Sequence, residues 1–334
     1  MDREEVVRRY KGKTVLVTGG VGCIGSNLVK AFLRGEAERV VVLDDFSSSF
    51  EWNLPKDPRV LLVRGSIMDE EAAKRAFSFK PHYVFHLAAH FANQNSVDHP
   101  ETDLLVNGLG TLRMLEYSKL VGVERFVFAS SGCSVYGSSA PLPFREDFVS
   151  IHLDTPYQIN KLVGELYCNY FCDYYEMPVS IARYFNVFGP GEVPGRYRNV
   201  IPNFMWLAMN GKPLPITGTG NETRDFTFVE DIVDGTLRLG VVPEAEGEAV
   251  NLASETETRV LDLANWVNEL SGNKSGLVYQ QKRDWDKSDR RRASIEKASR
   301  ILGYAPLTDL KAGLPHVHEW FKSNWENIKA SASF

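Results

Sequence analysis

The sequence predicts an α/β protein with a doubly wound parallel sheet and a smaller mixed α/β region toward the C-terminus. Through the first half of the 334 residues, short β-rich runs alternate with segments of helical apolar spacing. This alternation favours parallel strands joined by helices. A glycine-rich turn directly follows the first β-rich run. In the second half, proline- and glycine-rich loops replace the regular alternation, so a separate, smaller region is expected there.

The expected elements follow one another along the chain. The strand runs are rich in β-branched and aromatic residues and cover 13–18, 39–43, 59–63, 82–87, 124–129 and 179–184. The helical segments lie near 23–34, 69–78, 101–121 and 157–176. Further on, a short β stretch is expected at 223–229 and an amphipathic helix at 262–270. We expect one domain to span 1–185 with a return segment near 225–250, and a second to comprise 186–224 and 251–334.

Composition and charge argue against several classes of protein. The formal net charge is −5 and no basic stripe stands out, so nucleic acid is not an expected partner. No apolar run approaches the ~18–20 residues of a membrane span, and the charged N-terminal segment lacks the apolar core of a signal peptide. The four cysteines show no metal-ligand spacing, so no metal site is expected. We therefore expect a cytoplasmic protein with reduced thiols.

The turn after the first strand has the pattern G-x-x-G-x-x-G. Gly19 allows a sharp turn, Gly22 lets a phosphate approach the backbone, and Gly25 lets the next helix pack close to the sheet. The helix start, with Cys23 and Ile24, offers free N–H groups and a positive dipole end to a pyrophosphate. Because a plain strand–turn–helix also uses glycine, the pattern needs support from elsewhere in the chain.

That support comes from the second strand, which ends in Asp44 and Asp45. An acidic residue about 20 positions beyond such glycines binds the adenosine ribose of a dinucleotide. Asp44 would also repel a 2′-phosphate, which favours NAD over NADP. The alternative is that Asp44 only ends the strand and that Asp45, or neither residue, is the ligand.

A hydroxyl-rich segment at 130–137, containing Ser131 and Ser134, follows the fifth strand. Further on, Tyr157 and Lys161 are four residues apart, which places them on one face of a helix. A nearby ammonium favours the phenolate and lowers the tyrosine pKa, as a general base requires. Such a pair is common on any helix surface, but here it follows a nucleotide-binding turn and a hydroxyl-rich strand end.

The segment 282–292 is dense in charge. It follows loops that should lie at the carboxyl edge of the sheet, where an anionic sugar nucleotide would bind. Arg224 and Arg283 are the candidates for its diphosphate, because arginine suits phosphate oxygens. Surface salt bridging is the alternative, above all for 290–292.

Together these motifs resemble the extended short-chain dehydrogenase/reductases, in particular the nucleotide-sugar epimerase/dehydratase family. The resemblance extends from about residue 13 to about residue 303. Several motifs occur in the order found in the family, namely Thr18-Gly19-Gly20-x-Gly22-x-x-Gly25, Asp44, His86-Leu87-Ala88-Ala89, Val135-Tyr136-Gly137, Tyr157-x-x-x-Lys161, 183–190 and Thr223-Arg224-Asp225.

The resemblance implies a Rossmann-type domain that binds NAD and a C-terminal domain that binds a nucleotide sugar, most commonly a UDP-sugar. Tyr157 would be the base, and Lys161 would bind the nicotinamide ribose. The implied cofactor contacts are Gly19, Gly22, Cys23, Ile24, Gly25, Asp44, Ser66, Ile67, Leu87, Ala88, Ala89, Tyr157, Lys161 and Tyr184. The implied substrate contacts are Asn186, Arg224, Arg283 and Asp286, and His90 is expected to face the sugar. A homodimer through a four-helix bundle of 101–121 and 157–176 is also implied.

The implied reaction is 4-epimerisation of a UDP-hexose or UDP-hexuronate. Tyr157 takes the proton of the 4-hydroxyl as hydride leaves C4 for NAD, the 4-keto sugar rotates, and hydride returns to its other face. The alternatives are a dehydratase, a decarboxylase, a 4-ketoreductase, or a non-catalytic NAD-binding regulator. Dehydratases and decarboxylases of the family carry a carboxylate near the hydroxyl residue, where this chain has Cys133 and Ser134. Epimerisation is therefore favoured.

Two positions depart from the family pattern. Gly132 stands where relatives usually have serine or threonine. We expect Ser134, Ser131 or a water molecule in the glycine's space to replace that hydroxyl. Gly65-Ser66 stands where a glycine–aspartate pair is usual, which weakens one expected adenine contact.

Overall fold

A computed structural model describes all 334 residues of the chain. Its centre is a sheet of seven parallel strands, which are β1 (Thr14–Thr18), β2 (Arg39–Asp44), β3 (Val60–Arg64), β4 (Tyr83–His86), β5 (Arg125–Ser131), β6 (Val179–Tyr184) and β11 (Ala249–Leu252). The strand order is β11-β6-β5-β4-β1-β2-β3, and every neighbouring pair is parallel. The predicted α/β class and parallel sheet are confirmed, and six strands lie where they were expected.

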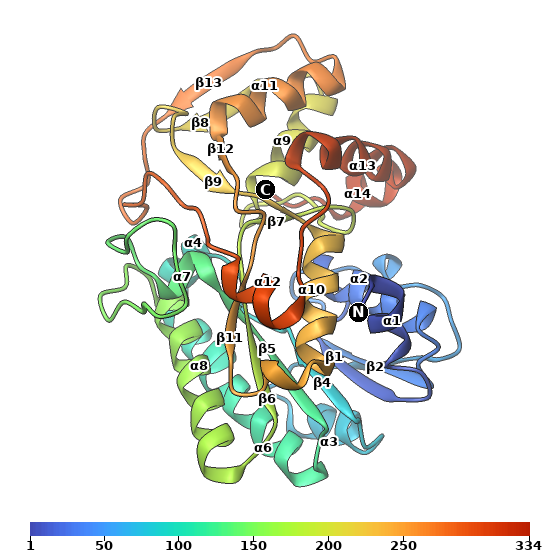
Figure 1. Cartoon of the computed structure of the whole chain (residues 1–334). Helices are drawn as coiled ribbons and strands as arrows, with labels where there is room; N and C mark the ends of the chain where they lie inside the picture. The colour runs from blue at the N-terminus through green and yellow to red at the C-terminus, as the bar shows by residue number, and fades with distance from the viewer.

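Helices cover both faces of the sheet, as Figure 1 shows. The helices on one face are α1 (Arg3–Arg8), α2 (Cys23–Arg34), α10 (Val229–Val241) and α12 (Glu296–Leu302). The helices on the other face are α3 (Glu70–Phe77), α6 (Thr111–Val121) and α8 (Pro156–Tyr175). Each face has its own apolar core, of 30 and 20 buried residues. Two separate cores, one on each side, make the sheet doubly wound.

The segment expected as one helix at 101–121 consists of three consecutive parts. These are α5 (Pro100–Asp103), a wide π-helical stretch η2 (Leu104–Gly110), and α6. The π-helical stretch contains Gly110, where a side chain would collide with Ile67. Wide turns of this kind occur often at functional sites, and here the turn follows Asp103, a fully buried carboxylate.

The C-terminal region packs around a third core of 17 buried residues above the sheet in Figure 1. Its helices are α9 (Val200–Met209), α11 (Val260–Ser271), α13 (Leu310–Ser323) and α14 (Trp325–Ser331). Its strands form two-stranded pairs, which are β7 (Val187–Phe188) with β10 (Thr227–Phe228), β9 (Thr223–Asp225) with β12 (Glu257–Arg259), and β8 (Leu214–Thr217) with β13 (Leu277–Gln280). The domain division remains a prediction, and α12 bears on it because this late helix packs on β11 and α10.

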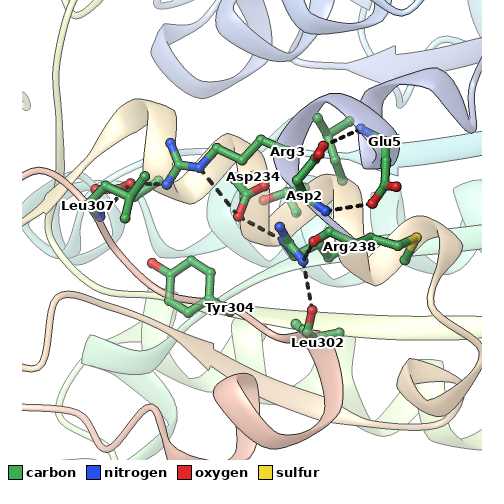
Figure 2. Close-up of polar contacts among 12 residues, drawn as sticks. Asp2, Arg3, Glu5, Asp234, Arg238, Leu302, Tyr304 and Leu307 are labelled. Carbon is green, nitrogen blue, oxygen red and sulfur yellow. Dashed lines mark hydrogen bonds and ion pairs between the residues drawn. The ribbon is translucent and has the colours of Figure 1, made fainter.

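The N-terminal helix α1 is tied to α10 and to the late part of the chain by a buried ionic cluster (Figure 2). Arg3 Nη2 lies 2.5 Å from Asp231 Oδ1, and Arg3 Nε lies 3.8 Å from Asp234 Oδ2. The backbone N–H groups of Leu307 and Thr308 also donate to the carboxylate of Asp231, each at 3.0 Å. Asp231 is fully buried, so these donors satisfy a charge that would otherwise be costly to bury.

No helix in the structure is both long and apolar enough to cross a membrane.

Candidate active site

A cavity of about 620 Å³ opens between the carboxyl edge of the sheet and the C-terminal region. A ligand crevice at this edge is typical of doubly wound sheets. The cavity brings together all but one of the residues predicted for the site, namely Gly19, Gly22, Cys23, Ile24, Gly25, Asp44, Ser66, Ile67, Leu87, Ala88, Ala89, His90, Ser131, Tyr157, Lys161, Tyr184, Asn186, Arg224, Arg283 and Asp286. Ser134 is the exception. The role of each of these residues in binding or catalysis remains a prediction.

The glycine turn has the geometry that a bound pyrophosphate requires. Gly19 has φ +66°, a left-handed conformation that glycine adopts without strain. A Cβ atom at Gly25 would lie 2.6 Å from the Cα atom of Gly20, so only glycine permits this contact between α2 and the turn. No side chain caps α2, which starts just after Gly22. The N–H groups of its first turn therefore remain for an anionic ligand, and the turn fits the pyrophosphate of NAD.

Asp44 is held at the end of β2 by three donors. Its Oδ2 accepts from Val21 N at 3.0 Å, and its Oδ1 accepts from Phe46 N at 3.0 Å and from Ser49 Oγ at 2.7 Å. These bonds fix the carboxylate beside the glycine turn, where it lines the cavity. Asp45 lines the cavity as well, so the choice between the two carboxylates as ribose ligand stays open.

Tyr157 and Lys161 project from the first turns of α8 and are both buried. Thr155 precedes the helix and accepts from Gln158 N at 3.4 Å, an N-cap that fixes where α8 begins. Lys161 Nζ donates to Ala129 O at 2.9 Å and lies 5.6 Å from the centroid of the Tyr157 ring. The lysine therefore bridges α8 and the end of β5, beside the phenol.

Burial shifts the pKa values of both groups toward their neutral forms. It lowers the pKa of Lys161 to about 8. It raises the pKa of Tyr157, and the neighbouring Asp103 and Cys133 raise it further. In the protein without ligands the pKa of Tyr157 is therefore raised, not lowered as the sequence analysis predicted, because burial, Asp103 and Cys133 all disfavour the phenolate. A bound cationic group beside the phenol would act in the opposite direction.

The expected substitutes for the missing hydroxyl at Gly132 need correction. Ser134 Oγ is fully buried without a hydrogen-bond partner, and the residue does not line the cavity. The glycine lies in the short helix α7 (Gly132–Val135), where a Cβ atom would lie 2.6 Å from Cδ2 of Phe185 and closer still to other ring atoms. The Phe185 ring fills the space assigned to a water molecule. Ser131 lines the cavity and is the remaining serine candidate.

At the far end of the cavity, two arginines contact one carboxylate. Arg224 Nη2 lies 2.8 Å from Asp286 Oδ2, and Arg291 Nη2 lies 3.3 Å from Asp286 Oδ1. Both guanidinium groups line the cavity and are largely buried. The sequence analysis gave surface salt bridging as the alternative for 290–292. Arg290 fits this alternative, in an exposed ion pair with Glu257, but the buried Arg291 does not.

Glu192 is a second cavity residue that the sequence analysis missed. It is buried and accepts from Asn199 Nδ2 at 2.9 Å, and burial raises its pKa to about 7. It lies in a loop of glycines and prolines whose path the sequence alone does not define.

No group of His, Cys, Asp and Glu side chains in the structure is arranged to hold a metal ion.

The chain is similar in sequence and in fold to known proteins along nearly its whole length. Residues 15–253 match the model of the NAD dependent epimerase/dehydratase family. A UDP-glucose 4-epimerase of Mycolicibacterium smegmatis is 34% identical over 313 residues, 92% of this chain and 98% of that protein. The solved epimerase Mth375 of Methanothermobacter thermautotrophicus is 58% identical with a TM-score of 0.98, covering 99% of this chain and 98% of that one. Bordetella bronchiseptica WbmF, solved with NAD+ and UDP, is 35% identical with a TM-score of 0.85, covering 97% and 96%.

Proposed function

The chain belongs to the NAD-dependent epimerase/dehydratase family, and we propose that it interconverts the two C4 configurations of a UDP-linked sugar. One observation carries this proposal. The buried pair Tyr157 and Lys161 lies in a single cavity that also contains a pyrophosphate-binding turn and a separate arginine cluster. This arrangement accommodates a dinucleotide and a nucleotide sugar with their reactive ends meeting at the phenol.

Each end of the cavity offers groups for one ligand. The glycine turn and Asp44 would hold NAD, which supplies a reversible hydride acceptor when bound. Lys161 would bind the nicotinamide ribose. Tyr157 would remove the proton of the sugar 4-hydroxyl and return it after the 4-keto sugar has rotated. The positive charge of a bound nicotinamide would favour the phenolate and oppose the effect of burial on the pKa of Tyr157.

The substrate end supports a diphosphate ligand. Arg224 and Arg291 share Asp286 and leave further guanidinium N–H groups for phosphate oxygens. Arg283 also lines this end. The names of the relatives agree with a UDP-sugar, because the mycobacterial relative is a UDP-glucose 4-epimerase and the Bordetella protein was solved with UDP.

Dehydratases and decarboxylases of the family carry a carboxylate at the position where this chain has Cys133. The Sγ atom of Cys133 lies 3.3 Å from Asn186 Oδ1. Dehydration and decarboxylation need additional acid–base groups near the sugar, so this position favours epimerisation. A 4-ketoreductase would need added reduced cofactor, so it would form no product in a cofactor-free assay.

Proton NMR of the purified protein tests the proposal without added cofactor. UDP-glucose, UDP-glucuronate and UDP-N-acetylglucosamine are incubated in separate tubes. A new anomeric signal from the galacto-configured sugar is expected in one tube and absent with Tyr157→Phe. A released keto or decarboxylated product would contradict the proposal. So would turnover by Tyr157→Phe at the wild-type rate, which would also remove the base from the mechanism.

We propose a homodimer through the helices α6 and α8 together with the π-helical stretch η2. Exposed apolar side chains gather on these elements, namely Leu104, Leu105, Leu109, Leu120, Ile159, Leu166, Tyr167, Tyr170, Tyr174 and Tyr175. An apolar surface of this extent is unusual for a monomer. Light scattering should give twice the chain mass for wild type and the chain mass for Leu166→Glu. A monomeric wild type would refute the assembly.

Two further assignments remain proposals. We assign NAD binding to the sheet domain and nucleotide-sugar binding to the C-terminal region, which the distribution of cavity residues supports. We also assign the protein to the cytoplasm. Its four cysteines are all free thiols, as is usual in a reducing compartment.

A further inference from the structure

Behind the pair Tyr157 and Lys161 lies a buried carboxylate with a histidine beside it. Asp103 is fully buried at the end of α5. Its Oδ1 accepts from Asn160 Nδ2 at 2.8 Å, and its Oδ2 accepts from Asn107 Nδ2 at 2.9 Å. Nδ1 of His90 lies 3.5 Å from the same Oδ2. That nitrogen is buried and has no hydrogen-bond partner.

The backbone holds His90 in this place. Its N–H donates to Asn107 Oδ1 at 2.9 Å, and its carbonyl accepts from Asn107 Nδ2 at 3.0 Å. Asn107 therefore contacts both His90 and Asp103, and it fixes the ring beside the carboxylate. His90 also lines the cavity. The sequence analysis assigned it to the sugar, but its ring lies against Asp103.

Asp103 is linked directly to the helix that carries the base. Its partner Asn160 lies on α8 between Tyr157 and Lys161. A charge buried in a region of low dielectric acts strongly on its neighbours. The negative charge of Asp103 adds to burial in raising the pKa of Tyr157, so it opposes the phenolate that the proposed reaction requires.

We propose that His90 and Asp103 form a charge-compensated pair that controls the ionisation of Tyr157. A proton on Nδ1 of His90, together with the one on Nε2, gives a cation that neutralises the carboxylate and permits Tyr157 to lose its proton. Without this cation, as in His90→Gln, the negative field of Asp103 is uncompensated and Tyr157 stays protonated. His90 and Asp103 are positioning residues here, and their catalytic consequence rests on the function proposed above.

Other ionisable groups surround the pair. Cys133 also raises the pKa of Tyr157. Lys161 lies 5.6 Å from the centroid of the Tyr157 ring, and Asp103 acts on this lysine too, in the direction that raises its pKa. The ring of exposed His99 lies 6.3 Å from the His90 ring, centroid to centroid, and forms no ion pair with Asp103. His99 is therefore a matched control, a second histidine beside the pair that does not contact the carboxylate.

Ultraviolet titration of the phenolate in the NAD-bound protein tests the proposal without any sugar substrate. The signal of Tyr157 is the difference between each protein and its counterpart carrying Tyr157→Phe. Asp103→Asn should move the titration of Tyr157 to lower pH by about one unit, a tenfold gain in phenolate at fixed pH. His90→Gln should move it to higher pH by a similar amount, and His99→Gln should leave it unchanged.

The double variant separates charge compensation from structural damage. Because His90 acts through Asp103, adding His90→Gln to Asp103→Asn should produce no further shift. An Asp103→Asn titration that does not move to lower pH would overturn the proposal, as would a His90→Gln effect that persists without Asp103. If Asp103→Asn does not fold, the shift in His90→Gln against His99→Gln decides alone. These outcomes stand whether or not a UDP-sugar is turned over.

If turnover is found, its pH profile gives a second readout. The ascending limb of kcat, which reports formation of the Tyr157 phenolate, should move to lower pH in Asp103→Asn and to higher pH in His90→Gln. A general loss of activity with an unchanged profile would indicate a structural role only and contradict the proposal.

Discussion

Replacing Gly132 with serine, the residue type usual in the family, should destabilise this protein instead of restoring a catalytic hydroxyl. The new Cβ atom would lie 2.6 Å from Phe185 Cδ2 and closer to other atoms of that ring. Phe185 is fully buried, and its ring centroid lies 6.2 Å from those of both Tyr136 and Phe144, so the ring has no free space to enter. Overpacking a core in this way costs about 1–3 kcal/mol. The better helix propensity of serine offsets only about 0.5 kcal/mol of that cost.

Urea denaturation measures this change in the free energy of unfolding. Phe185→Leu supplies the matched second variant, because it removes the ring atoms that collide with the new Cβ atom. The double variant should be more stable than the sum of the two single effects by at least about 1 kcal/mol. If Gly132→Ser alone were as stable as wild type, the Phe185 ring would not occupy this space. The argument that Gly132 and Phe185 form one packing unit would then be refuted.

Three other changes test the site and its support. Asp44→Asn should weaken NAD binding about 10-fold or more and reduce discrimination against NADP, measured by calorimetry; unchanged affinity would transfer the ribose to Asp45. Glu165→Gln should cost about 3–5 kcal/mol in urea denaturation, because the buried Arg183 loses a carboxylate bonded at 2.7 and 3.0 Å; a loss below about 1 kcal/mol would contradict this. Burial raises the pKa of Glu192 from 4.5 to about 7, so the wild type loses stability as pH rises between these values. Glu192→Gln should therefore match wild type near pH 4.5 and exceed it by about 3 kcal/mol at about pH 8; an equal difference at both pH values would contradict the assignment.

Much of the fold was predictable because its signals are local. The six expected strands are short apolar runs with clear ends, and the predicted start at Asp69 corresponds to a side-chain cap that accepts from Glu71 N and Ala72 N. The seventh strand was missed as a strand because β11 has only four residues and contains the buried Asn251. The N-terminal helix α1 was missed because its charged sequence has little apolar pattern, and its position depends on an ionic cluster with residues far along the chain.

The site was predictable where one residue type performs one local task. Gly19 and Gly25 are required by a backbone angle and a close contact within the same turn. The missed features depend on contacts between distant segments. The Phe185 ring occupies the space beside Gly132, although the two are 53 positions apart, and no local pattern reports this. The burial of Arg291 likewise depends on how the charged loop folds back over the cavity.

The buried ionic cluster around Asp231 has a consequence for how the chain is made. Arg3 is synthesised long before Leu307 and Thr308, whose backbone N–H groups complete the set of donors to Asp231. Until then, α10 carries a carboxylate with an incomplete set of donors. A nascent chain released early would therefore keep an unsatisfied charge beside the core that α1 covers. Complete neutralisation of Asp231, which α1 also contacts, therefore depends on a segment that is synthesised long after α1 and α10.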